Sequence, residues 1–168
     1  MIWKAVFFVL FVFSTAALCA ANSTSAGSAI LYQFRAVGDD EARIYGLVNR
    51  ERDKKKLRGL NWNSRLAKLA RAYSRKMANE GFFDHFDRRG KSVIDRANDS
   101  GIDDWAKIGE NLFMCRGIEM FSDFAVRGWM RSPEHRKNIL DRKWTSTGIG
   151  IAIARNGSIY ITQIFLAD

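Results

Sequence analysis

The chain has 168 residues, of which 47% are hydrophobic and 27% are charged, and its formal net charge is +9. This balance is that of a soluble globular protein, and the length suffices for one domain with a core of its own. The single proline excludes a proline-rich linker or stalk, and no fixed-period repeat is visible.

Residues 1–21 are predicted to form a signal peptide. Lys4 precedes an apolar run over 5–13, and the small residues at 19–21 favour cleavage before Asn22. One alternative is a retained membrane anchor, although a span needs about 20 apolar residues. A second is lipid attachment at Cys19. The sequence therefore predicts a secreted, periplasmic or extracellular protein without a permanent membrane span after cleavage.

Cysteine usage adds one constraint. After signal removal Cys115 is the remaining thiol, so no disulfide within the chain is expected. In the stretch ENLFMCRG it is interpreted as a small apolar core residue.

The mature chain is expected to open with a flexible leader over residues 22–38 and to continue as one domain over 39–168. Apolar residues at helical spacing predict a helix over 39–57 and a stronger one over 64–80. Asn63 or Ser64 is the expected N-cap of the second helix, and Gly81 its stop.

Shorter helices are predicted over 92–101, 119–132 and 133–140, the last opened by Ser132 and Pro133. In the 119–132 helix Phe124 and Trp129 are expected to face inward, and Trp62 is assigned to the core by default.

The C-terminal segment changes to alternating, isoleucine-rich runs. Asn156-Gly157 lies between 148–154 and 159–166, which is a strong hairpin signal. A hairpin alone is marginal, so a third strand is needed, and 107–114 supplies it. The prediction is an α+β domain in which helices cover a small antiparallel sheet.

Basic residues gather in two places. One is the run RERDKKKLR (50–58), and the other is a stripe on the 64–80 helix. The stripe consists of Arg65, Lys68, Arg71, Arg75 and Lys76. Because an exported protein rarely meets nucleic acid, no nucleic-acid partner is expected, and anionic cell-envelope polymers or lipid head groups are the predicted encounters. A merely solvated helix face is the alternative.

Several motifs occur together in a specific order: LNWNSRLAKLARAYSRKMA, FFDHF, IGENLF, GWMRSPEHRKNIL, STGIGIAI and YITQIF. In this order they resemble the CAP superfamily, which covers cysteine-rich secretory, antigen 5 and pathogenesis-related proteins and is also called the SCP domain. The bacterial exported branch is the most similar, and the resemblance spans 39–168. It implies an α-β-α sandwich around a three-stranded antiparallel sheet.

The resemblance also implies a ligand cleft lined by two histidines and acidic residues. Carried over by position, these are His85, Glu110 and His135, and Ser132 stands where the family often has a second glutamate. The missing carboxylate puts in doubt any mechanism that needs two.

Two neutral imidazoles can hold Zn²⁺ or another divalent cation at about 2.0–2.1 Å from each nitrogen. Because structural zinc takes four protein ligands and catalytic zinc usually three, His85 and His135 predict weak binding, and no cofactor is required. The alternative is a hydrogen-bonded cluster of His85, Glu110 and His135 that merely fixes the surrounding loops.

The function predicted from these residues is ligand or cation binding by an exported, monomeric domain, with catalysis not expected. One alternative is a metal-assisted hydrolase in which Glu110 acts as general base for an ion held by His85 and His135. A third is a cell-envelope interaction protein that uses its basic helix face.

Overall fold

A computed structural model describes residues 23–168. The predicted signal peptide, its cleavage site and Cys19 lie outside these residues. The chain divides into two units, Met1–Gln33 and Phe34–Asp168. None of the helices within residues 23–168 combines the length and apolar character needed to cross a bilayer.

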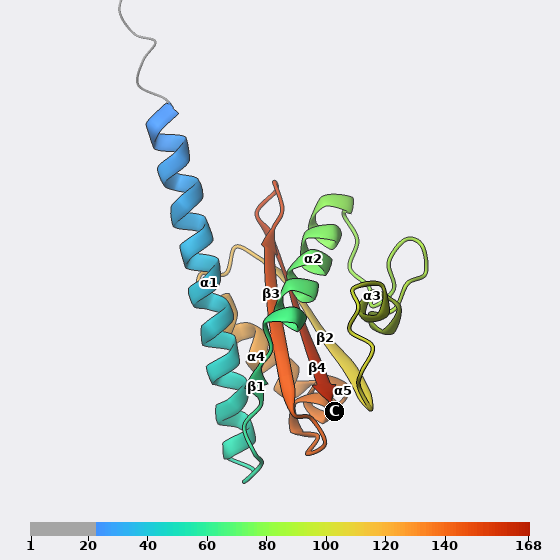
Figure 1. Cartoon of the computed structure of the whole chain (residues 1–168). Helices are drawn as coiled ribbons and strands as arrows, with labels where there is room; N and C mark the ends of the chain where they lie inside the picture. The colour runs from blue at the N-terminus through green and yellow to red at the C-terminus, as the bar shows by residue number, and fades with distance from the viewer. Residues whose placement is uncertain (1–22) are drawn as a thin grey trace, which may run out of the picture. The chain divides into compact units, whose positions relative to one another are not determined.

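The centre of the domain is a four-stranded sheet with the order β1-β3-β4-β2 (Figure 1). Its strands are β1 (Asn61–Trp62), β2 (Lys107–Arg116), β3 (Ser146–Ile153) and β4 (Ser158–Ala167). Strand β4 pairs antiparallel with both β2 and β3, whereas β1 pairs parallel with β3. The three predicted strands are thus present, with β2 at one edge of the sheet.

The short strand β1 was not predicted, because the stretch GLNWN was interpreted only as a break between helices. Two residues cannot show an alternating pattern, so their pairing depends on the neighbouring strand. The N–H groups of Asn61 and Asn63 donate to the carbonyls of Thr145 and Thr147 over 3.0 and 2.9 Å.

Helix α2 (Ser64–Glu80) covers one face of the sheet, and its predicted ends are confirmed. The Asn63 side chain accepts hydrogen bonds from the N–H groups of Arg65 and Leu66, and Gly81 ends the helix in the left-handed conformation. The helix lies almost directly on β3. A Cβ atom at Gly148 or Gly150 would lie 2.2 or 2.0 Å from a backbone nitrogen of α2. Glycine at both positions therefore sets the spacing of these two layers.

Helices α1 (Ser23–Asp53), α4 (Phe121–Arg131) and α5 (Pro133–Leu140) supply the core on the other face of the sheet. This core is formed by Ile44, Val48, Phe121, Ala125, Trp129, Ile139, Ile149, Ile161 and Phe165. Helix α3 (Val93–Asp99) packs beside α2 through Ala97, which shares a second apolar cluster with Leu66 and Leu69. Helices on both faces of a mixed sheet confirm the predicted α+β class.

The segment predicted as a leader has helical backbone. Helix α1 begins at Ser23 and runs through residues 23–38. This stretch is free of proline and contains good helix formers such as alanine and leucine.

Two aromatic residues expected in the core are exposed. Phe124 is 47% exposed because the buried arc of α4 runs through Phe121, Ala125 and Trp129, and Arg127 packs over its ring at 4.6 Å. Trp62 is 38% exposed and meets Tyr45 edge-on.

The basic stripe predicted on α2 is divided in the structure. Arg71 turns away to the buried carboxylate of Glu41, with Nε lying 2.9 and 3.0 Å from its two oxygens. Because Glu41 is 3% exposed at its side chain, this pair fastens α2 to α1 and does not contribute to an open basic surface.

Candidate functional site

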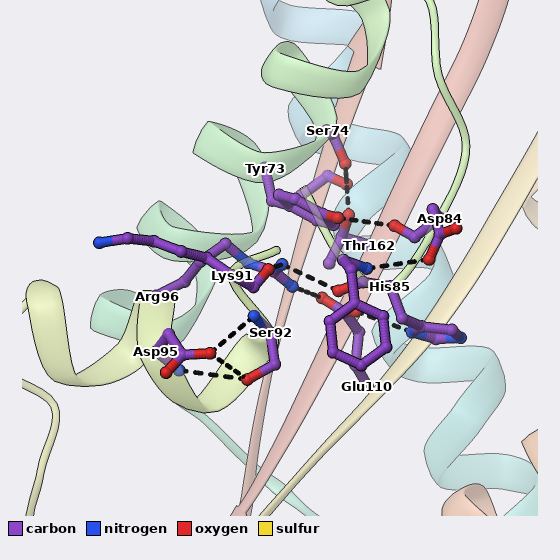
Figure 2. A network of polar contacts seen from close by, with 12 residues as sticks. Tyr73, Ser74, Asp84, His85, Lys91, Ser92, Asp95, Arg96, Glu110 and Thr162 are labelled. Atoms are coloured by element: carbon purple, nitrogen blue, oxygen red, sulfur yellow. Dashed lines mark hydrogen bonds and ion pairs between the residues drawn. The ribbon is translucent and has the colours of Figure 1, made fainter. Parts of the chain in front are cut away.

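Glu110 is the centre of the candidate site. It lies in the edge strand β2, and its carboxylate is only 2% exposed. One oxygen, Oε1, lies 2.8 Å from Nδ1 of His85, and the other, Oε2, accepts a hydrogen bond from Nη2 of Arg96 over 2.5 Å (Figure 2). A buried carboxylate requires such partners, because an isolated buried charge is strongly unfavourable.

Arg96 was not among the residues predicted for the site. It lies on α3 and is only 8% exposed, and its Nη1 donates to the carbonyls of His85 and Lys91 over 3.0 Å each. Its guanidinium also stacks on the ring of Tyr73, 3.3 Å from the centroid. The sequence holds one signal for this role, since Arg96 precedes Ala97 on the inward side of a short helix, where arginine is unusual.

His85 is presented by the loop between α2 and α3. Tyr73 fixes the start of this loop by donating from its hydroxyl to the Asp84 carbonyl over 2.6 Å. Burial raises the pKa of Tyr73 to about 12, so that hydroxyl keeps its proton. The imidazole of His85 is oriented by Glu110 and not by the neighbouring carboxylates of Asp84 and Asp87.

Asp87 instead organises the remainder of the loop. Its carboxylate accepts from the N–H groups of Arg89 and Lys91 and lies 2.9 Å from Nζ of Lys76. The hydrogen bond from Lys91, followed by the contact with Lys76, holds the pKa of Asp87 well below its usual range. Asp87 is therefore a structural residue of the loop.

His135 approaches from α5, which contributes to the other layer of the sandwich. Asn111 donates from its side chain to the His135 carbonyl over 3.1 Å. Asn138 donates to the Glu110 carbonyl and to Oδ1 of Asn111 over 3.1 and 2.9 Å. These two amides hold α5 to the edge strand next to Glu110.

The pKa values of the two histidines are shifted in opposite directions. Burial lowers the pKa of His135, and the charge of His85 lowers it further. The hydrogen bond to Glu110 raises the pKa of His85, against the opposing effect of burial. The surroundings of His135 therefore favour the neutral imidazole, and those of His85 favour the protonated one.

Ser132 is separate from this cluster. It is the N-cap residue of α5, yet its hydroxyl makes no capping hydrogen bond, and no side-chain hydrogen bond within residues 23–168 joins it to Glu110 or the histidines. Ser132 occupies the predicted N-cap position, but its side chain does not cap the helix. The proline at the first helical position sets the start of α5 instead.

The donor set fits a divalent cation only at an open site. When His85 is neutral, its Nδ1–H bond to Glu110 directs the lone pair to Nε2, the arrangement in which a carboxylate orients a metal-binding histidine. His135 favours its neutral, ligating form. No group of three or more histidine, cysteine or acidic side chains within the described residues is arranged to hold a metal. A cation here would keep water or an external ligand in its remaining positions.

Glu110 has little access to solvent. Each carboxylate oxygen already accepts from a side chain and the side chain is only 2% exposed, so a cation or a water would have to enter a buried site to reach the remaining lone pairs. This geometry speaks against Glu110 as the general base of a metal-assisted hydrolase.

This sandwich, with a histidine-bearing loop and a histidine-bearing helix at the edge strand, defines the class of protein. The family model of the cysteine-rich secretory protein family, CAP, matches residues 45–165. The chain belongs to this family.

Two proteins from Bacillus subtilis (strain 168) are similar to this chain in sequence. The chain is 35% identical over 123 residues to "Uncharacterized protein YkwD", covering 73% of this chain and 46% of that protein. It is 31% identical over 126 residues to "Uncharacterized membrane protein YlbC", covering 75% of this chain and 34% of that protein. The chain thus spans less than half the length of either relative.

Solved structures share the fold. An extracellular protein containing an SCP domain from Bacillus anthracis superposes with a TM-score of 0.68 at 25% identity, over 78% of this chain and 41% of that one. An outer surface protein from Borrelia burgdorferi superposes with a TM-score of 0.69 at 20% identity, over 77% of this chain and 92% of that one.

Proposed function

We propose that this chain is an extracellular binding domain whose ligand binds at His85 and His135, and that a weakly held divalent cation is the ligand that this pair fits best. The observation that carries the proposal is the 2.8 Å contact between Nδ1 of His85 and Glu110. It leaves Nε2 of His85 as the available donor atom and fixes the orientation of the ring.

The opposite pKa shifts support the proposal. A cation competes with protons for imidazole nitrogen, so His135, whose pKa is lowered, is ready to bind without losing a proton. His85 holds its proton more tightly, because its pKa is raised, so competition with protons falls mainly on this residue. Binding should therefore strengthen as the pH rises.

Calorimetric titration with ZnCl₂ at about pH 7.5 tests this function. We expect the wild-type chain to bind with a dissociation constant of about a micromolar or weaker, since two protein ligands make an incomplete shell. His85→Ala/His135→Ala should abolish the heat of binding. Glu110→Gln should weaken binding roughly 10- to 100-fold, as is usual when the group that orients a ligand is changed.

Glu119→Gln is the matched control for this experiment. Glu119 is exposed and makes no hydrogen bond or ion pair with His85, Glu110 or His135. This variant should bind zinc like the wild type. Equal affinity in the wild type and the double histidine variant would reject the proposed cation site.

We also infer that the chain acts outside the cytoplasm. The apolar segment at 5–13 and the extracellular and outer-surface proteins that share its fold support this inference. N-terminal sequencing of the exported product should begin at Asn22, and retention of the whole chain in the cytoplasm would contradict export.

A further inference from the structure

A basic groove lies between α2 and α3, outside the histidine pair. It consists of two cavities of about 280 and 340 Å³ that share Leu69, Ala72 and Ser100 as lining residues. The α2 residues that line it lie at positions 65, 68, 69, 72, 73 and 76, which form one face of a helix. From Arg65 to Lys76 this face runs about 16 Å at 1.5 Å per residue.

The groove carries an excess of positive charge. Within the described residues its unpaired cations are Arg65, Lys68 and Arg89, since Lys76, Lys91 and Arg96 form ion pairs with carboxylates. In all, six basic and two acidic side chains line it: Arg65, Lys68, Lys76, Arg89, Lys91 and Arg96, with Asp87 and Asp99. Three of these basic residues come from the 89–96 segment, so the surface arises only when that segment folds against α2. It differs from the stripe predicted from α2 alone, which included Arg71.

Several of these cations have hydrogen-bonding capacity to spare. The side chains of Lys68 and Arg89 form no ion pair with any described residue. The Nε atom of Arg96 is buried and has no hydrogen-bond partner among the described residues. A buried donor of this kind is unfavourable unless a ligand or water satisfies it. The groove thus offers long-range attraction and, at the exposed side chains of Lys68 and Arg89, unpaired cationic groups for an anionic ligand.

We propose that this groove binds a linear acidic glycopolymer, a chain of sugar units that carry carboxylate or phosphate groups. Its length accommodates more than one unit, and the buried side chains of Leu69 and Ile102 provide an apolar floor for the C–H faces of sugar rings. Guanidinium and ammonium groups along the walls match repeating anionic groups.

The lining of the groove does not favour a nucleic acid. Single-stranded nucleic acids bind largely by stacking bases on exposed aromatic side chains. Tyr73 is the one aromatic residue among the lining residues; it is 2% exposed, and the Arg96 guanidinium covers its ring. Without a stacking surface, the groove recognises charge and backbone shape.

The test uses a fluorescently labelled oligogalacturonate, a linear sugar chain with one carboxylate per unit, and measures its affinity by fluorescence anisotropy. We expect Lys68→Ala/Arg89→Ala to raise the dissociation constant about tenfold or more, since two charged contacts are lost. Because both residues are exposed, the variant should keep the thermal unfolding midpoint of the wild type.

The matched control is Lys55→Ala/Lys143→Ala, which removes the same charge from exposed positions outside the groove. It should change the affinity less than about twofold. Equal weakening in both double variants would mean that binding depends on net charge alone and would overturn the groove. His85→Ala/His135→Ala should bind the polymer like the wild type, which separates this proposal from the cation site.

Two further arms decide the class of ligand. Single-stranded DNA of equal charge that competes as well as the oligogalacturonate would overturn the assignment to a glycopolymer. Inorganic phosphate is the second competitor. If it displaces the probe as effectively as the unlabelled polymer at the same concentration of anionic groups, the groove does not recognise a chain, and the proposal is overturned. If Lys68→Ala/Arg89→Ala unfolds, the wild type is titrated with the oligogalacturonate and its amide chemical shifts are followed by NMR. Shift changes confined to 65–76 and 87–96 support the groove as the binding site, and changes elsewhere contradict it.

Discussion

Nδ1 of His85 and Oε1 of Glu110 lie 2.8 Å apart, although the two residues are separated by α3 and belong to a loop and to an edge strand. This contact joins the layer of α2 and α3 to the strand that carries Asn111. Through Asn111 it is connected to the backbone of His135 on the opposite layer. The relationship fixes the tautomer of one histidine and influences the charge state of the other.

The two histidines should titrate on opposite sides of the usual value near 6.5. The carboxylate of Glu110 raises the pKa of His85, and burial together with the charge of His85 lowers that of His135. Because the chain has two histidines in all, NMR titration of the imidazole Cε1–H signals resolves each one. Glu110→Gln should lower the pKa of His85, and a pKa for His85 below that of His135 in the wild type would contradict the structure.

The stability of the fold should depend on pH through the same pair, with opposite signs. A raised pKa means that His85 stabilises the folded chain fully below its unfolded pKa of about 6.5, and that this contribution is lost as the pH rises through its folded pKa. For His135 the folded pKa is lowered, so stability falls as the pH drops below about 6.5 and protonation begins to favour the unfolded chain.

Urea unfolding at about pH 5 and about pH 8 measures these contributions. His85→Gln should destabilise the fold more at the acidic pH than at the alkaline one. His135→Gln should gain stability relative to the wild type as the pH falls. The two variants serve as controls for each other, and parallel pH dependence in both would argue against opposite pKa shifts.

Arg96→Met should destabilise the domain by about 3–5 kcal/mol, because it leaves the Glu110 carboxylate buried with one partner fewer. Arg96→Met/Glu110→Gln should recover part of this loss, since no buried charge then remains. The free energy of unfolding from urea denaturation is the measurement. Arg88→Met is the control: Arg88 is 60% exposed at its side chain, and its loss should cost no more than about 0.5 kcal/mol.

Gly150→Ala should destabilise the domain by about 3 kcal/mol or more, or prevent folding, because its Cβ would lie 2.0 Å from the backbone nitrogen of Arg71. Neither backbone can move without separating α2 from the sheet. Gly46→Ala is the matched control in α1, where a Cβ meets nothing within 4 Å. It should stabilise the fold by about 0.5–1 kcal/mol by removing glycine from a helix. The thermal unfolding midpoints of both variants are measured. Similar changes at the two sites would contradict the close contact between α2 and β3.

Local sequence patterns predicted much of the fold. The helix over 64–80 has an amphipathic face and both caps, and the hairpin has Asn156-Gly157, where Gly157 adopts a φ of +81°. Such signals depend on a few adjacent residues, so the sequence alone was sufficient. The pairing of His85 with Glu110 was also expected, but only from the order of motifs that the family shares.

Other features depended on which segments meet in three dimensions. The sequence shows Arg71 and Lys68 as equivalent cations on one helix. In the structure Arg71 is paired with a buried glutamate thirty residues earlier, and Lys68 lines a groove completed by the 89–96 segment. In the sequence Arg96 is one of many arginines. In the structure it is buried beside Glu110 and forms an ion pair with this carboxylate.

The sequence by itself therefore determined the class of fold and the principal helices and strands, because short-range spacing encodes amphipathic faces, caps and turns. The histidines and glutamate of the candidate site came from the order of motifs that the family shares. The tertiary structure decided how the carboxylate is used and which cations share a surface. Those properties follow from desolvation and from contacts between residues far apart in the chain, which no local pattern records.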